Sequence, residues 1–204
     1  MAKLTLYTNP MSRGRIVRWM LEEVGQPYEA VILGYGPDMN TARYLALNPM
    51  GKVPCLVHGQ TIITEGAAIC TYLADAFPEA GLMAADRGRF LRWMFWGAGP
   101  LEAAISNKAL GFAVPKEREG TIGYGNLDRV LRTLETCVEA ADPYLAGPKF
   151  SALDVYLGSQ IGWGMQFGTL PATPAMTAYW ARVKDRPALK RAQDIDNALI
   201  PAKE

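Results

Sequence analysis

Residues 48–56, NPMGKVPCL, decide the fold of the first part of this chain. Val53, Cys55 and Leu56 predict the start of a strand, but Pro54 lies inside it. Proline has no backbone N–H to donate and is normally confined to edge strands or bulges. The proline therefore indicates a special backbone geometry at the beginning of this strand.

Around this stretch, the first 80 residues alternate between strand and helix patterns. A strand is followed by a helix that Gly25 ends, then by a second strand and a short helix. A hairpin and a helix ended by Pro78 complete the pattern. The expected order is βαβ-α-ββα, with elements at 4–7, 13–24, 28–33, 41–47, 53–57, 61–64 and 65–77.

The second half of the chain has only helical patterns, which predict helices at 89–112, with a bend near Gly97 and Pro100, and at 127–145. A third helix begins within FSALDVYLG, where Ser151 and Asp154 fit a variant capping box that stabilises the fold. We therefore predict an α/β domain at 1–80 and an all-helical bundle domain at 86–204.

Composition excludes several classes of function. The chain is 50% hydrophobic with a formal net charge of +1, so it has no global field to attract nucleic acid or anionic membranes. It has no apolar run long enough for a membrane span, and we expect a cytoplasmic protein. A single histidine and three cysteines without a CxxC pair give no metal-site pattern, so no metal is predicted.

Four stretches together resemble the glutathione S-transferase family: LTLYTNPMSRGR, GKVPCL, TEGAAICTYLAD and FSALDVYLG. The resemblance covers essentially the whole chain. It implies a thioredoxin-like N-terminal domain, a helical C-terminal domain and a homodimer. It also implies a transferase that uses glutathione as a co-substrate and needs no further cofactor.

In that family the Val-Pro bond is cis, which implies that the Val53 backbone beside Pro54 pairs with the cysteinyl part of glutathione. The resemblance also implies that Glu65 and Gly66, at a helix start, hold the γ-glutamyl end. Many members have serine where this chain has Gly66, so one hydrogen bond to the ligand is missing here. Lys52 is placed to meet the glycyl carboxylate.

The thiol of glutathione must become a thiolate to attack an electrophile. In the family the activating group lies in the loop after the first strand and at the start of the first helix. Ser12 is the first candidate, Tyr7 the second and Asn9 the third, while Ser12 as a plain helix cap remains an alternative. Cys55 is expected in the core, because buried free cysteine behaves mostly as a small hydrophobic residue.

An electrophile pocket should be apolar, and aromatic residues of the second half could supply it. Phe112 and Trp163 are the better candidates for its rim. Trp96 is a further candidate, although its spacing from Trp93 also suits simple helix packing.

The leading functional hypothesis is conjugation of glutathione to small hydrophobic electrophiles in detoxification, with glutathione-dependent peroxide or disulfide reduction as an additional activity to be tested. A non-catalytic protein that binds glutathione or apolar ligands is the alternative, and a scaffold protein is a third. No nucleic-acid or membrane partner is expected.

Overall fold

The computed structural model describes residues 2–200. Contacts divide these residues into two units. The first contains the chain up to Leu82 and again from Asp185 onward, and the second is Met83–Lys184. Within the described residues, no helix is long and apolar enough to cross a membrane.

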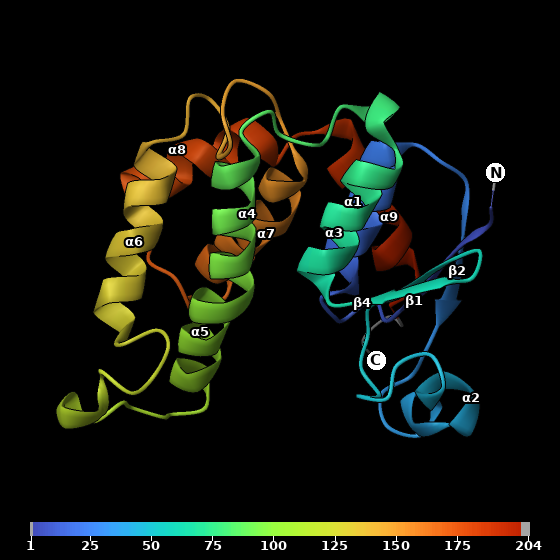
Figure 1. The fold of residues 1–204 in the computed structure, drawn as a ribbon, viewed down its shortest axis with the longest axis horizontal. Helices are drawn as coiled ribbons and strands as arrows, with labels where there is room; N and C mark the ends of the chain where they lie inside the picture. The colour runs from blue at the N-terminus through green and yellow to red at the C-terminus, as the bar shows by residue number, and fades with distance from the viewer. Residues whose placement is uncertain (1, 201–204) are drawn as a thin grey trace. The chain divides into compact units, whose positions relative to one another are not determined.

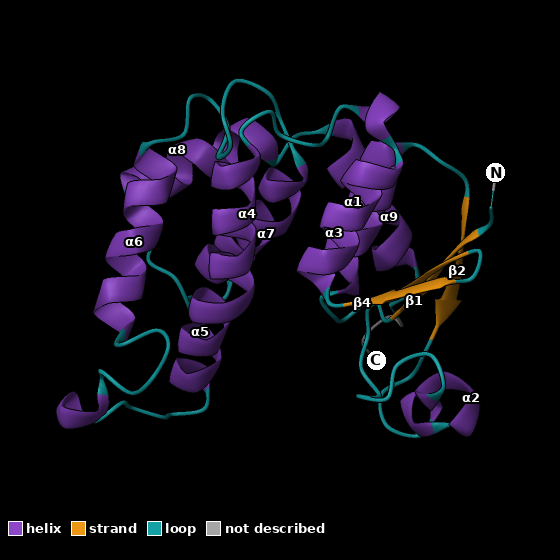
Figure 2. Ribbon diagram, viewed as in Figure 1, coloured by secondary structure: helices purple, strands orange, loops and turns teal. Residues whose placement is uncertain are grey.

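The first unit is built on a four-stranded sheet of order β2-β1-β3-β4, shown in orange in Figure 2. β1 runs parallel to β2 and antiparallel to β3, and β3 forms the predicted hairpin with β4. The strands are β1 (Leu4–Thr8), β2 (Tyr28–Ile32), β3 (Cys55–His58) and β4 (Thr61–Thr64).

Helices cover both faces of this sheet. α1 (Gly14–Val24) packs between α3 (Gly66–Ala76) and α9 (Pro187–Ala198) on one face, and α2 (Ala42–Leu45) lies on the other (Figure 1). Short 3₁₀ turns at Asp38–Asn40 and Pro78–Ala80 follow β2 and α3. The predicted α/β arrangement, with a thioredoxin-like βαβ-α-ββα order, is confirmed.

Alternation of side chains along the strands forms the two sides of the core. Leu6 and Leu56 pair across β1 and β3 and are fully buried, as are Val17 and Met20 of α1. On the opposite face, Cys55 packs with Met39 and Tyr44. Burial raises the pKa of the Cys55 thiol to about 11, which fits its expected place in the core.

The second unit is entirely helical among the residues described, and its helices are α4 (Arg87–Trp96), α5 (Glu102–Ala109), α6 (Leu127–Glu139), α7 (Ala152–Gln166) and α8 (Pro174–Val183). A π-helical segment at Gly97–Leu101 joins α4 to α5, where the sequence predicted a bend, and a 3₁₀ turn occupies Lys116–Arg118. The predicted capping box begins α7, whose first eleven residues are all buried.

The last helix does not belong to the helical unit by its contacts. α9 packs along α1, and Arg18, Glu22 and Glu23 of α1 form ion pairs with residues on or just before α9. The division therefore differs at the C-terminal end from the predicted domain of 86–204. The reason is that a helical pattern does not indicate which domain a helix packs against.

Candidate functional site

Strand register brings three predicted site segments to one end of the sheet. Tyr7 of β1 lies opposite Cys55 of β3, which in turn lies opposite Thr64 of β4. The loop after β1, the residues before β3 and the start of α3 therefore emerge beside one another. Ser12, Pro54 and Glu65 lie in these three segments.

The loop after β1 is held by the side chain of Asn9. Its Nδ2 donates to the Leu33 carbonyl at 2.7 Å, and its Oδ1 accepts from the Met11 N–H at 2.8 Å. Asn9 is 8% exposed, so both polar atoms are committed inside the protein. These bonds give Asn9 a structural role in this loop, beside its predicted place at the glutathione site as the third candidate activator.

Ser12 has a local hydrogen-bond pattern. Its Oγ donates to the Asn9 carbonyl at 2.7 Å and accepts from the Gly14 N–H at 2.9 Å. The N-cap position of α1 is Arg13, one residue later than expected, and Arg13 makes no side-chain capping bond. Ser12 nevertheless satisfies one amide of the first helical turn, so the cap interpretation and the activator interpretation both fit its position.

Tyr7 differs from the other two candidate activators. It is half-buried, and its ring lies 5.6 Å from the ring of Tyr44, centroid to centroid. Within the described part of the chain, no hydrogen bond engages its hydroxyl. The Tyr7 hydroxyl can therefore interact with a ligand without breaking an existing bond.

The Val53–Pro54 peptide bond is cis, as the family resemblance implies. The preceding carbonyl, that of Lys52, accepts hydrogen bonds from the Tyr44 hydroxyl at 2.5 Å and from Asn48 Nδ2 at 2.7 Å. No hydrogen bond joins the Val53 backbone to another residue among those described. The segment is thus fixed in place while Val53 keeps an unpaired backbone, and the Lys52 side chain is exposed.

Glu65 directly precedes α3 and has an unusual backbone. Its φ is 66°, the only positive value for a non-glycine residue in the part of the chain described. Such geometry costs about 1–3 kcal/mol and is enriched at ligand-binding positions. The side chain is exposed and makes no capping bond, and Gly66 begins the helix. The first turn of α3 therefore has N–H groups without intrahelical partners, beside a carboxylate that has no hydrogen bond or ion pair to any described residue.

The three predicted electrophile residues are not brought together within the second unit by any ring contact among the described residues. Trp96 lies at the end of α4, with its ring 5.4 Å from that of Trp93. Trp163 is half-buried in α7, and Phe112 is 66% exposed after α5. The contact between Trp93 and Trp96 supports the packing interpretation for Trp96.

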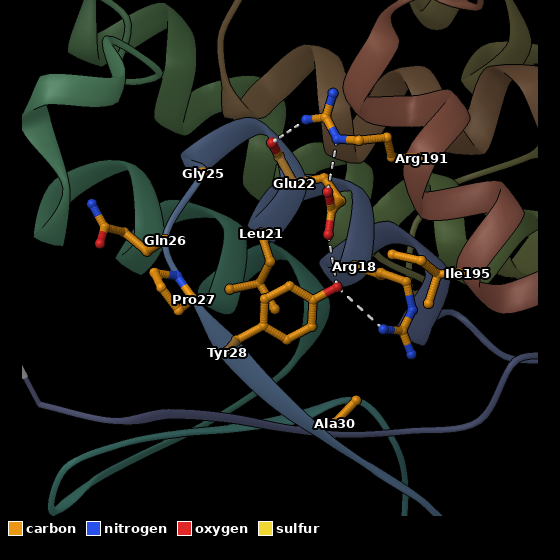
Figure 3. A pocket seen from close by; sticks show the side chains of 10 residues that line it. All are labelled: Arg18, Leu21, Glu22, Gly25, Gln26, Pro27, Tyr28, Ala30, Arg191 and Ile195. Carbon is orange, nitrogen blue, oxygen red and sulfur yellow. Dashed lines mark hydrogen bonds and ion pairs between the residues drawn. The ribbon is translucent and has the colours of Figure 1, made fainter.

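A cavity of about 660 Å³ lies elsewhere in the first unit (Figure 3). Tyr28 donates a hydrogen bond to Glu22 at 2.9 Å and accepts one from Arg18 at 3.2 Å, and burial raises its pKa to about 12. Because Tyr28 pairs with Leu4, this cavity is at the opposite end of β1 from Tyr7. None of the predicted site residues lines it.

Sequence reasoning missed two residues that fix the backbone just before the Val53–Pro54 bond. Tyr44 and Asn48 fix the Lys52 carbonyl. The sequence has one weak signal for them, since Asn48 directly precedes Pro49 in a turn-forming stretch. Tyr44 looks like an ordinary helix residue in the sequence.

Comparison with known proteins identifies the family. Residues 6–81 match the family model for the glutathione S-transferase N-terminal domain. The chain is 29% identical over 194 residues to glutathione S-transferase GST-4.5 of Xanthomonas campestris pv. campestris, covering 88% of this chain and 92% of that protein.

Solved structures agree with this match. A theta class glutathione S-transferase from Xanthomonas axonopodis pv. citri, with glutathione bound, is 30% identical with a TM-score of 0.73, covering 94% of this chain and 97% of that one. A sphingomonad glutathione S-transferase complexed with glutathione is 28% identical with a TM-score of 0.73, covering 95% and 98%. The chain therefore belongs to the glutathione S-transferase family, which is a family of transferases.

Proposed function

We propose that this protein is a glutathione transferase that joins the glutathione thiolate to small hydrophobic electrophiles. The observation that carries the proposal is the meeting of three loops at one end of the sheet, with the unpaired Val53 backbone in the middle segment. An extended peptide can pair with such a backbone as an added strand would. The relatives solved with glutathione bound support glutathione as that peptide.

Each end of glutathione has a matching group in this arrangement. The Glu65 carboxylate meets the γ-glutamyl ammonium, and the Gly66 N–H at the positive end of α3 meets the neighbouring carboxylate. The exposed ammonium of Lys52 meets the glycyl carboxylate. With the cysteinyl part paired to Val53, the thiol is directed toward the loop after β1.

Ser12 is our first choice for the group that stabilises the thiolate. A free thiol with a pKa of about 8.5 is only a few per cent ionised at neutral pH, so a donor to sulfur is needed. The Gly14 N–H already donates to Ser12 Oγ, which polarises the hydroxyl and makes it a stronger donor. To reach sulfur, this O–H must leave the Asn9 carbonyl, whereas the second choice, Tyr7, has no such bond to break.

A pH titration of the ultraviolet thiolate absorbance of bound glutathione tests this proposal. It uses the wild-type protein, Ser12→Ala and Tyr7→Phe. We expect a thiol pKa about 1–2 units below that of free glutathione in the wild type, which corresponds to about 1.4 kcal/mol of thiolate stabilisation per unit. Ser12→Ala should return the pKa toward the free value, and Tyr7→Phe should change it little.

The other outcomes have definite meanings. A return toward the free value in Tyr7→Phe alone would make Tyr7 the activator. An unshifted pKa in the wild type, with glutathione bound, would refute catalysis and favour the non-catalytic binding protein. The missing hydroxyl at Gly66 is the observation that keeps this second candidate in view.

We further propose that the protein acts in detoxification, in the cytoplasm and as a homodimer, with glutathione-dependent peroxide or disulfide reduction as a side activity. The three cysteines are free and buried, which suits a reducing compartment. A reductase activity would then use the sulfur of glutathione itself. Sedimentation velocity tests the dimer, and a single species with the mass of one chain would exclude it.

A further inference from the structure

The guanidinium of Arg15 connects two segments that are far apart in the sequence. Its Nη1 donates to the Pro10 carbonyl at 3.3 Å, in the loop after β1. Its Nη2 donates to Asn197 Oδ1 at 2.5 Å, and its Nε lies 3.9 Å from Asp196 Oδ2, both at the end of α9. Arg15 therefore bridges α9 and the loop that contains Ser12.

The α9 end of this bridge is rigidly held. Asp196 is fully buried, and its Oδ1 accepts from Arg18 Nε at 2.7 Å. Arg18 is itself 1% exposed and donates to the Tyr28 hydroxyl. A buried ion pair with a further hydrogen bond fixes the side chains that take part in it. Arg15 thus contacts the end of α9 where the Asp196 side chain is held by Arg18.

The loop end of the bridge is next to the groups that form the candidate activator site. Pro10 directly follows Asn9, whose carbonyl accepts from both the Ser12 amide at 3.1 Å and the Ser12 hydroxyl at 2.7 Å. A shift of the Pro10 carbonyl therefore moves the peptide group that orients Ser12 Oγ.

We propose that Arg15 is a positioning residue, through which α9 sets the place of the thiol-activating loop. This inference rests on the proposed function of that loop. Arg15 reaches the Pro10 carbonyl and Asn197 Oδ1 with two different nitrogens, so its contribution is mainly geometric, through the two-ended hydrogen bonding of a planar guanidinium. In this way α9 influences the pKa of the glutathione thiol through the position of the loop after β1.

The experiment compares Arg15→Met, Arg15→Lys and Asn197→Ala with the wild-type protein. Hydrogen exchange of a peptide covering residues 9–12 should become faster by about tenfold in all three variants, because the loop opens more often without the bridge. With glutathione and 1-chloro-2,4-dinitrobenzene, kcat should fall about fivefold while KM for glutathione changes less than twofold, since a misplaced activator affects the reacting atoms more than binding. The bound thiol pKa should rise in parallel.

Arg191→Met is the matched control. Arg191 also joins α9 to α1, by its bond to Glu22 at 3.0 Å, but at the other end of the helix pair. It should leave the thiol pKa and the exchange of residues 9–12 unchanged. Equal effects of Arg191→Met and Arg15→Met would overturn the proposal, because general loosening of α9 would then explain both.

The variants also separate position from charge. Arg15→Lys keeps the positive charge but loses the guanidinium that reaches two acceptors. Full wild-type behaviour of Arg15→Lys would overturn the geometric role. A depressed thiol pKa in the wild type that stays depressed in Arg15→Met would refute this inference alone. An undepressed pKa in the wild type would refute the proposed function, and unchanged exchange in Arg15→Met would then refute the bridge as well.

Discussion

Two serines at helix starts, Ser12 before α1 and Ser151 before α7, use the same chemistry in different surroundings. Ser151 is 1% exposed, and both its N–H and its hydroxyl donate to Asp154 Oδ2 at 2.9 Å. Asp154 Oδ1 also accepts from the Leu145 N–H and the Tyr179 hydroxyl, each at 2.9 Å. Ser12 is only half-buried and bonds to its immediate neighbours.

The difference shows how burial decides what a capping serine can do. Buried polar groups must keep their hydrogen bonds, because an unmade bond costs the full desolvation of the group. The Ser151 hydroxyl is therefore committed to stability. The Ser12 hydroxyl can change its partner at little cost, since water or a ligand can replace the bond it gives up. A serine hydroxyl can donate to a ligand when its own hydrogen bonds are made to neighbouring residues and are partly exposed to water.

Asp154→Ala should give the largest loss of stability in the second unit. It leaves four donor bonds without an acceptor inside the protein, and we expect the free energy of unfolding to fall by about 3–5 kcal/mol. Urea unfolding measures this change. Asp128→Ala, in the exposed first turn of α6, is the matched control and should stay within about 0.5 kcal/mol. Similar losses in the two variants would contradict the role of the buried box.

Gly14→Ala should disturb the start of α1 with a smaller loss. A Cβ at Gly14 would lie 1.9 Å from Thr8 Oγ1, which is buried, so the loop or the strand end must move. We expect a loss of about 1–3 kcal/mol in unfolding free energy, together with lower transferase activity. Gly99→Ala is the control, because nothing lies within 4 Å of its added Cβ. A fully active and stable Gly14→Ala would show that this loop is more adaptable than its packing indicates.

Replacing Ser12 and Ser151 one at a time tests most directly whether the two hydroxyls have different roles. Ser151→Ala should lower the free energy of unfolding by about 1–2 kcal/mol without changing the bound thiol pKa, because it removes a buried cap far from the thiol in the sequence. Ser12→Ala should lower it by less than about 1 kcal/mol, as expected for a partly exposed cap. Urea unfolding of both variants measures this difference. Equal stability losses would remove the distinction between the two serines.

Alkaline titration should give the smallest effect and concerns the core behind the candidate site. Burial raises the pKa of the Cys55 thiol to about 11 in the folded protein, from an ordinary value of 9.0. Its contribution to stability is complete below pH 9 and is lost as the pH rises toward 11, because only the unfolded state ionises in that interval. Cys55→Ala should remove at most about 1.4 kcal/mol of this loss at pH 10. Urea unfolding at pH 8, 9 and 10 measures the slope, and an unchanged slope would contradict the burial of the thiol.

Local patterns in the sequence were sufficient for much of the fold. The alternation of strands and helices, the hairpin after Pro54, the bend near Pro100 and the capping box of α7 depend on residues a few positions apart, so each could be predicted. The cis bond before Pro54 followed from the family resemblance. The predicted functional residues Lys52, Val53 and Glu65 lie in the segments that strand register brings together.

The features that escaped prediction depend on long-range packing or on backbone geometry without a residue signal. The pairing of Arg15 with Asn197 joins residues 182 positions apart, and no local pattern indicates it. The positive φ of Glu65 occurs in a residue type that rarely adopts it. The direction in which Trp163 faces depends on how α7 packs, which periodicity alone does not determine, and Phe112 lies in the loop after α5 rather than in the predicted helix.

The return of α9 to the first unit has a consequence for how the chain is made. Synthesis proceeds from the N-terminus, and domains generally fold as units when their last segment appears. The first unit receives its last helix only after Met83–Lys184 has been synthesised. Until then Arg18 has no Asp196 to pair with. We therefore expect the α/β unit to complete its fold only after the whole all-helical unit, which follows it in the sequence, has been synthesised.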